Sequence, residues 1–251
     1  MSRLFLTFVA ISALTITSGW AEGDTLPIPK QTWSFAGPTG TFQRDALQRG
    51  YQVFKEVCSA CHGIKQITYG KLMGIGLSKE VVKALAAEHD QPDLNDEGQP
   101  TQRKGIISDK IHSPFPNDKA ARASNNGALP PDLSLITKAR AGGPNYVYAL
   151  LTGFCAAPAD STLSEGMYYN PYFSGRQIAM APPLFEGQVK FADGTKATVG
   201  QMARDVVTFL SWTAEPEMEQ RKQMGVKVLF YLLILTFVLY LSKRKIWKGV
   251  K

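Results

Sequence analysis

Cys58-Ser59-Ala60-Cys61-His62 is the most informative stretch of this sequence of 251 residues. Two cysteines separated by two residues and followed at once by histidine form the pattern for covalent attachment of haem c. The spacing suits the chemistry, because two such thiols can add to the two vinyl groups along one porphyrin edge, while the next residue offers its imidazole to the iron. We therefore predict one covalently bound haem c, held by Cys58 and Cys61, with His62 as an iron ligand.

A C-x-x-C pair also occurs in thioredoxin-like redox sites and in zinc sites. The chain has one further cysteine, Cys155, so a zinc site of four cysteines is excluded. No strand-rich βαβ pattern precedes Cys58, which disfavours the redox alternative. Cys155 has no partner for a disulfide once the other two thiols carry haem, and we expect it to be a buried thiol.

The residues before the motif form an amphipathic pattern. Asp45 lies in the expected first turn, where an acidic side chain suits the helix dipole. Apolar positions recur at steps of three and four, as on one face of a helix: Leu47, Tyr51, Phe54, Val57, Cys58 and Cys61. We predict that this helix leads into the attachment site.

A second helix is expected over 198–213, because Met202, Val206, Phe209 and Leu210 follow the same helical steps. Gly50 on the first helix would allow the two to cross closely. Residues 65–122 are rich in proline and charge and are expected to be loops, apart from a short helix over 78–88 capped by Ser78. The predicted fold is mainly α, a class I cytochrome c-like haem domain with long loops plus one C-terminal transmembrane helix.

Both ends of the chain indicate export and anchoring. Residues 1–21 read as a signal peptide, with Arg3 before an apolar run and Gly19-Trp20-Ala21 at the cleavage site. A short N-terminal anchor is the alternative. We predict that residues 22–224 form the exported haem domain, 225–242 the transmembrane anchor and 243–251 a basic tail. The helix that contains the anchor would start earlier, at Pro216. By the positive-inside rule the tail is cytoplasmic. We predict a single-pass protein of the inner (cytoplasmic) membrane, with its haem domain in the periplasm.

The formal charge of +7 does not indicate nucleic-acid binding. All 21 acidic residues lie in 22–224, together with 21 of the 28 basic residues, so the exported domain is formally neutral. Of the seven excess positive charges, six belong to the anchor and tail and one is Arg3 in the predicted signal peptide. A nucleic-acid partner would need a basic patch on the domain itself, and none is apparent.

A second axial ligand should complete the coordination of the iron. His89 and His112 lie in segments that read as polar loops, so neither is favoured. Among the methionines, Met167 and Met180 remain plausible by position. Met180 precedes Pro182 and Pro183, which stiffen the backbone and would hold a thioether at little entropic cost, so we prefer it.

Three further segments accompany the attachment motif and the anchor. They are Asn125-Asn126-Gly127-Ala128-Leu129-Pro130-Pro131-Asp132-Leu133-Ser134, Tyr148-Ala149-Leu150-Leu151-Thr152-Gly153-Phe154, and Asn170-Pro171-Tyr172-Phe173 before Met180-Ala181-Pro182-Pro183. In this order and spacing the chain resembles the cytochrome c1 family in its bacterial form, from about residue 33 to the end.

The resemblance implies a set of haem contacts. Cys58 and Cys61 would carry the thioethers, and His62 and Met180 would be the axial ligands. Arg140 and Tyr146 match positions beside a haem propionate, and a guanidinium suits that carboxylate. The remaining positions match the lining of the haem pocket: Asn125, Ala128, Pro130, Pro131, Leu150, Leu151, Phe173, Ile178 and Pro183.

The resemblance also implies a function. A cytochrome c1 is a one-electron carrier in a quinol–cytochrome c reductase, beside cytochrome b and the Rieske iron–sulfur subunit. It passes electrons from the Rieske protein to a soluble cytochrome c, and the enzyme activity belongs to the complex. The alternatives are an anchored cytochrome subunit of a terminal oxidase or nitric-oxide reductase, and a haem enzyme such as a peroxidase. The acidic segment from Glu88 to Glu97 either docks the acceptor cytochrome or is simply a solvated loop.

Overall fold

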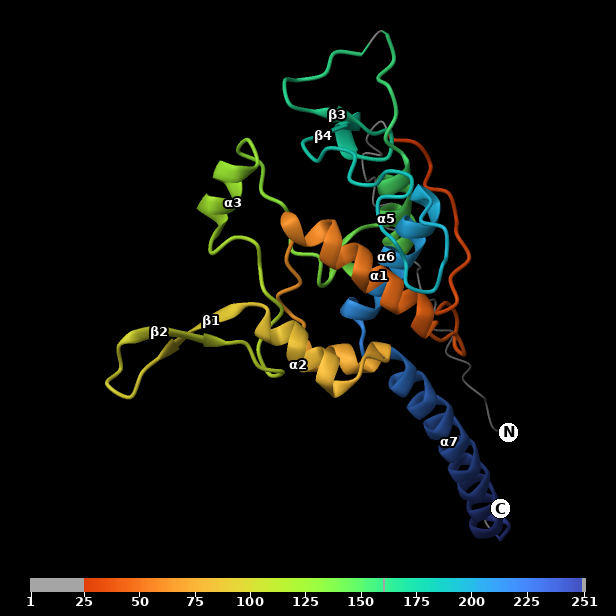
Figure 1. The fold of residues 1–251 in the computed structure, drawn as a ribbon. Coiled ribbons are helices and arrows are strands. Elements are labelled where there is room, and N and C mark those ends of the chain that lie inside the picture. The colour runs from red at the N-terminus through yellow and green to blue at the C-terminus, as the bar shows by residue number, and fades with distance from the viewer. Residues whose placement is uncertain (1–24, 160, 250–251) are drawn as a thin grey trace.

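A computed structural model of the chain describes residues 25–159 and 161–249 (Figure 1). The described residues are mostly helical, as expected, with two short antiparallel strand pairs. The predicted signal peptide falls in residues 1–24, outside the described part of the chain.

The crossing of α1 (Arg44–Glu56) and α6 (Val199–Ala214) forms the centre of the domain. Gly50 permits this contact, because a Cβ atom at this position would lie 2.1 Å from the backbone oxygen of Asp205. The predicted inward face of α6 is confirmed, since Met202, Val206, Phe209 and Leu210 are all buried. Thr198 caps α6 by accepting a hydrogen bond from the backbone N–H of Gln201 at 3.1 Å.

Two further helices pack against α6. They are α4 (Ile136–Ala139) and α5 (Gly143–Thr152). Trp212 near the end of α6 is almost fully buried and stacks on Phe209, with ring centroids 5.8 Å apart. Burying large aromatic side chains of this kind is a main source of core stability, at about 2 kcal/mol or more for each ring.

The segment 65–122 contains more regular structure than the sequence indicated. It forms η2 (Tyr69–Ile75), α2 (Lys79–Ala87), the hairpin β1 (Asp90–Leu94) and β2 (Pro100–Lys104), and α3 (Asp118–Ser124). The short helix capped by Ser78 is confirmed in α2. The expected acidic loop is instead a hairpin with Asp93 opposite Thr101, and it projects from the body of the molecule (Figure 1).

The chain between α5 and α6 follows an irregular path. It contains β3 (Tyr168–Tyr169), η3 (Ser174–Arg176) and β4 (Gln177–Ile178), with Tyr168 opposite Ile178. Cys155 lies just after α5 and is exposed, so the expected buried thiol is wrong. Helical periodicity could not predict the exposure of Cys155, because α5 ends at Thr152 and the cysteine lies in the loop beyond.

The C-terminal helix α7 (Met218–Trp247) leaves the domain as a single rod (Figure 1). It begins two residues after Pro216, and it is long and apolar enough to cross a membrane. Its first turns dock on the domain. Lys222 donates to the backbone oxygens of Phe35 and Gly40 at 2.7 and 2.9 Å, and Glu219 accepts from the backbone N–H of Phe42 at 2.7 Å.

Candidate haem site

The end of α1 delivers the attachment motif. The α-helix stops at Glu56, and Cys58–Ala60 form a 3-10 turn (η1) in which the backbone N–H groups of Cys61 and His62 both donate to the oxygen of Cys58. The predicted helix leading into the attachment site is therefore confirmed as α1, and the motif itself forms the turn that follows it. The tighter turn arises because these two amides share one acceptor, and it brings the cysteines and the histidine into a compact arrangement.

Neither motif cysteine forms a disulfide. Burial, reinforced by the neighbouring Cys61, raises the pKa of the Cys58 thiol to about 12. A thioredoxin-type or metal-binding cysteine needs a lowered pKa, because the thiolate is the reactive form. A protected thiol that becomes a neutral thioether has no such requirement. The raised pKa of Cys58 therefore gives no support to a reactive or metal-binding thiolate at this position.

The ring of His62 is oriented by a backbone carbonyl. Its Nδ1 atom lies 2.7 Å from the oxygen of Pro131, which can only accept, so Nδ1 carries the proton. Nε2 is then the nitrogen left to bind a metal. Burial lowers the pKa of His62, although the Pro131 carbonyl and the charge of Asp132 oppose that shift. A neutral, oriented imidazole is the form that iron requires.

A network around Asp132 fixes the Pro131 carbonyl. Asp132 accepts from the backbone N–H of Lys65 at 2.8 Å and from that of Ser134 at 2.9 Å. Ser134, which is fully buried, accepts from the backbone N–H of Gln66 at 3.0 Å. Both residues lie in the segment singled out from the sequence, but their part in positioning His62 was missed. An aspartate two residues before a serine in a proline-rich turn was the available signal.

The predicted residues after α3 form one segment, and its two prolines reach the attachment motif. Asn125 caps the C-terminal end of α3, because its side-chain amide donates to the backbone oxygen of Ala121 at 2.7 Å. Its backbone oxygen accepts from the backbone N–H of Ala128. Pro130 and Cys61 line the same shallow hollow of about 30 Å³. The structure therefore brings Pro130 and Pro131 to the attachment site, whereas Asn125 and Ala128 stand earlier on the same segment.

The predicted residues of α5 and of the β3–β4 region are linked by Asn170. Its buried side chain donates to the backbone oxygen of Leu150 at 2.8 Å and accepts from the backbone N–H of Tyr172 at 3.1 Å. This link was also missed from the sequence. The predicted apolar residues there are all half-buried, as expected of side chains that a further group covers: Leu150, Leu151, Phe173, Ile178 and Pro183.

Met180 lies on the segment that leaves β4. It is half-buried, and the chain beyond it enters the core at Leu184, which is only 6% exposed. Met167, the alternative, precedes β3 and is 37% exposed. Of the two, Met180 is the better shielded from water.

Arg140 and Tyr146 are neighbours. Arg140 ends α4 and is exposed, and Tyr146 on α5 is half-buried. Burial raises the pKa of the Tyr146 phenol, and the positive charge of Arg140 opposes that shift. A cation and a phenol side by side at the surface can bind a carboxylate, which is what a haem propionate requires.

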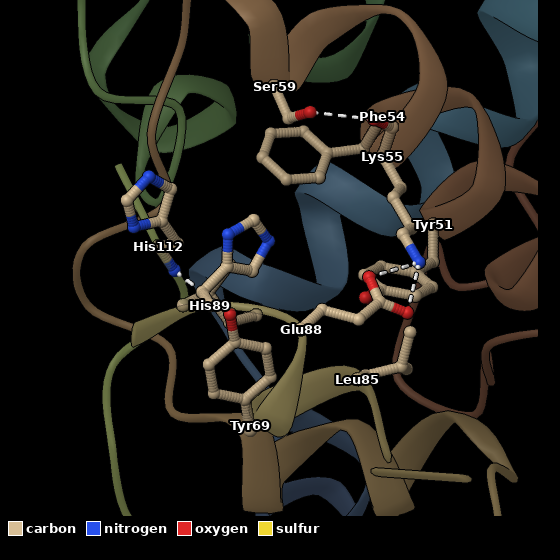
Figure 2. A pocket seen from close by; sticks show the side chains of 10 residues that line it. Tyr51, Phe54, Lys55, Ser59, Tyr69, Leu85, Glu88, His89 and His112 are labelled. Atoms are coloured by element: carbon tan, nitrogen blue, oxygen red, sulfur yellow. Dashed lines mark hydrogen bonds and ion pairs between the residues drawn. The ribbon is translucent and has the colours of Figure 1, made fainter. Parts of the chain in front are cut away.

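His89 and His112 lie outside the helices and strands, as expected, and His112 is exposed, but the two segments meet. Their rings stack on each other, with centroids 4.4 Å apart and planes 5° from parallel. Figure 2 shows the pair beside Tyr69 in a cavity of about 90 Å³, with the Lys55–Glu88 ion pair across it. None of the predicted haem ligands lines this cavity.

The donor set described above fits a haem: two unpaired thiols, one oriented imidazole, and half-buried apolar side chains on three segments. Comparison with known proteins agrees. The profile of the Cytochrome C1 family matches residues 33–250.

The chain belongs to the cytochrome c1 family. It is 47% identical over 239 residues to cytochrome c1 of Rhodospirillum rubrum, covering 88% of each chain. It is 46% identical over 241 residues to the mitochondrial cytochrome c1 heme protein of Saccharomyces cerevisiae, covering 95% of this chain and 78% of the relative. It is also 47% identical over 249 residues to cytochrome b/c1 of Bradyrhizobium diazoefficiens, covering 90% of this chain and 36% of that protein.

Family membership assigns the cofactor as covalently bound haem c and the function as that of the c1 subunit of a cytochrome bc1 complex, an electron-transport protein. The oxidase-subunit and peroxidase alternatives are thereby set aside.

Proposed function

We propose that this chain is a single-pass electron carrier that takes one electron from a Rieske iron–sulfur subunit and passes it to a cytochrome c. It would act beside cytochrome b at the inner (cytoplasmic) membrane, with the haem domain (22–224) in the periplasm. The observation that carries the proposal is the His62–Pro131 hydrogen bond, because it presents Nε2 of a neutral imidazole from the attachment motif.

Bound haem would supply one-electron chemistry by cycling its iron between two oxidation states. Cys58 and Cys61 would hold the porphyrin, and His62 and Met180 would bind the iron. Ligation by histidine and methionine raises the reduction potential, which suits an acceptor of electrons from a high-potential iron–sulfur centre.

The other predicted residues hold and shield that group. Leu150, Leu151, Phe173, Ile178 and Pro183 would exclude water, and a drier site favours the less charged form of the iron centre. Asn125, Ala128, Pro130 and Pro131 would cover the side of the attachment motif. Arg140 and Tyr146 would neutralise a propionate, because a guanidinium stays charged at every physiological pH.

The membrane topology follows from the charge pattern of the C-terminal helix. Its apolar run is bounded by Lys227 and Lys243, which can extend their ammonium groups to the two interfaces. Arg244, Lys245, Lys248 and Lys251 follow and would stay in the cytoplasm. The docked first turns of α7 would hold the haem domain at the opposite surface.

The ligand assignment is tested by paired variants. We expect Met180→Leu to abolish the weak ferric sulfur-to-iron band near the red edge of the spectrum and to lower the potential, whereas Met167→Leu should retain both. The reverse result would transfer the ligand role to Met167. The assignment of partners is tested by gentle purification of the full chain, which should bring cytochrome b and the Rieske subunit with it.

A further inference from the structure

Arg49 on α1 forms an ionic contact with two other parts of the chain. Its Nε and Nη2 atoms donate to the two carboxylate oxygens of Asp205 on α6, at 2.8 and 3.2 Å. Its Nη1 atom donates to Asp193 at 2.7 Å. The Arg49 side chain is 13% exposed and that of Asp205 only 1%, so this arm of the contact is shielded from water.

Asp193 belongs to the segment that joins Met180 to α6. This segment is held against α1 at a second point, where the Gln52 side-chain amide donates to the backbone oxygen of Lys190 at 3.0 Å. Between these points Phe191 is buried, and the Arg49 guanidinium lies 6.0 Å from the centre of its ring. The segment downstream of Met180 therefore rests on the outer side of α1.

The same helix carries the attachment motif at its C-terminal end, because η1 follows α1 directly. One rigid helix thus supports both sides of the site: it delivers Cys58 and His62, and through Arg49 it restrains the segment that follows Met180.

We propose that Arg49, with Asp193 and Asp205, is a positioning residue that keeps the Met180 thioether in register with the His62 side of the haem. The inference rests on the proposed ligation by Met180 and extends it to a residue remote from the attachment motif. The guanidinium does not touch the iron ligands. It acts by limiting how far the segment after Met180 can move away from α1, and hence how readily the thioether gives way to another ligand.

Both charges are present at neutral pH. The two carboxylates raise the pKa of Arg49, and the backbone N–H of Thr195 together with Arg49 lowers that of Asp193 to about 2. The Asp193 side chain is 42% exposed, so its arm contributes less than the shielded Asp205 arm.

Asp193→Asn is the sharpest test. The backbone N–H of Thr195 donates to Oδ1 of Asp193 at 2.9 Å, and an asparagine oxygen can still accept that bond. The turn is therefore kept, whereas the charge and the hydrogen bond to Arg49 are both lost, because an NH2 group replaces the oxygen that accepts from Nη1. The probe is imidazole, which binds ferric haem by displacing a methionine ligand. We expect the imidazole affinity of the full-length ferric protein to rise about threefold in Asp193→Asn, as an exposed ion pair allows.

Substitution of Arg49 should act more strongly. Arg49→Lys loses the two-pronged contact with Asp205 but keeps a charge, and Arg49→Gln loses both. We expect the imidazole affinity to rise about tenfold in Arg49→Gln and by less in Arg49→Lys. The matched control is Lys55→Gln, which removes the ion pair between α1 and Glu88 without touching the segment after Met180. It should bind imidazole as the unmodified protein does.

Two results would overturn the inference. One is an unchanged imidazole affinity in Asp193→Asn. The other is an equal rise in Lys55→Gln, which would indicate a general loss of stability. If Met180→Leu abolishes the sulfur-to-iron band and either of these results is found, the ligand assignment stands and only the positioning role fails. If Met180→Leu keeps the band, the assignment and the inference fail together.

Discussion

His62 and Pro131 are joined by a hydrogen bond of 2.7 Å from a ring nitrogen to a backbone carbonyl, across 69 positions of the sequence. The bond fixes the proton on Nδ1 and makes the imidazole a stronger donor toward a metal. Its strength depends on how firmly the Pro131 carbonyl is held.

Loss of Asp132 should therefore change the reduction potential. Asp132→Ala removes both backbone hydrogen bonds that hold the turn, so the Pro131 carbonyl is freed and His62 becomes a weaker base. A weaker donor stabilises the ferric state less, so we expect the midpoint potential to rise by about 20–60 mV. A shift of about 59 mV is a tenfold change in the equilibrium constant of a one-electron couple. Redox titration measures this. The control is Asp118→Ala, which removes another carboxylate from the hollow that Cys61 and Asp132 line. It should leave the potential unchanged.

The His89–His112 stack should make the hairpin sensitive to acid. Burial and the facing His89 lower the pKa of His112 below its ordinary 6.5. The unfolded chain then binds the proton first, so the stabilisation is present above pH 6.5 and is lost as the pH falls below it. The Lys55–Glu88 ion pair also lies near the two histidines. The phenols of Tyr51 and Tyr69 stay neutral, because burial raises their pKa.

Hydrogen exchange of the β1–β2 amides, corrected for intrinsic rates, should show this loss between about pH 7 and 5.5. His112→Phe keeps an aromatic ring that can stack but cannot be protonated, and it should remove the acid sensitivity of the hairpin. Amides of α6 in the same sample should not respond. An acid response that survives in His112→Phe would assign it to another group.

The tip of the hairpin is the part of the acidic segment that remains free to attract a basic cytochrome. Asp93 is paired with Arg103 at 2.8 Å, and Glu88 with Lys55 at 2.8 Å. Among the described residues neither Asp96 nor Glu97 forms an ion pair.

The double variant Asp96→Asn with Glu97→Gln should slow electron transfer to cytochrome c at low salt, by about two- to fivefold, and flatten the salt dependence of the second-order rate. Asp93→Asn is the comparison and should have a smaller effect, because its charge is already compensated by Arg103. A salt slope identical to that of the unmodified protein would leave the tip as a solvated turn.

Truncation after Met224 should release a soluble haem domain. After removal of the signal peptide, residues 22–224 carry 21 basic and 21 acidic groups, so with its propionates the holoprotein should focus below about pH 7, against a full-chain pI near 9.2. The retained turns of α7 keep the contacts of Glu219 and Lys222 with the domain. Isoelectric focusing and the reduced spectrum test this.

A shorter truncation after Glu215 provides the contrast. It removes Glu219, Lys222 and the buried Met218, and it should lower the denaturant midpoint of unfolding. Equal stability of the two truncated proteins would show that the first turns of α7 contribute nothing to the domain.

Local patterns were enough to predict much of this fold. The attachment motif, the inward face of α6 and the Ser78 cap all depend on residues near one another in sequence, where periodicity and side-chain chemistry have direct consequences. The uncharged run of the C-terminal helix was visible for the same reason.

Other features depend on contacts between residues far apart in the chain. The stacking of His89 on His112, the exposure of Cys155 and the two arms of Arg49 have no local signature, because a side chain's burial and partners are set by whichever segment packs against it. The acidic segment was missed for a different reason: its charged composition indicated a loop, whereas the chain pairs with itself as a short antiparallel hairpin, with the ion pairs Asp93–Arg103 and Asp90–Lys104 across it. Residue types and spacing thus predicted the cofactor and the residues proposed to hold it, and long-range packing determines what surrounds those residues.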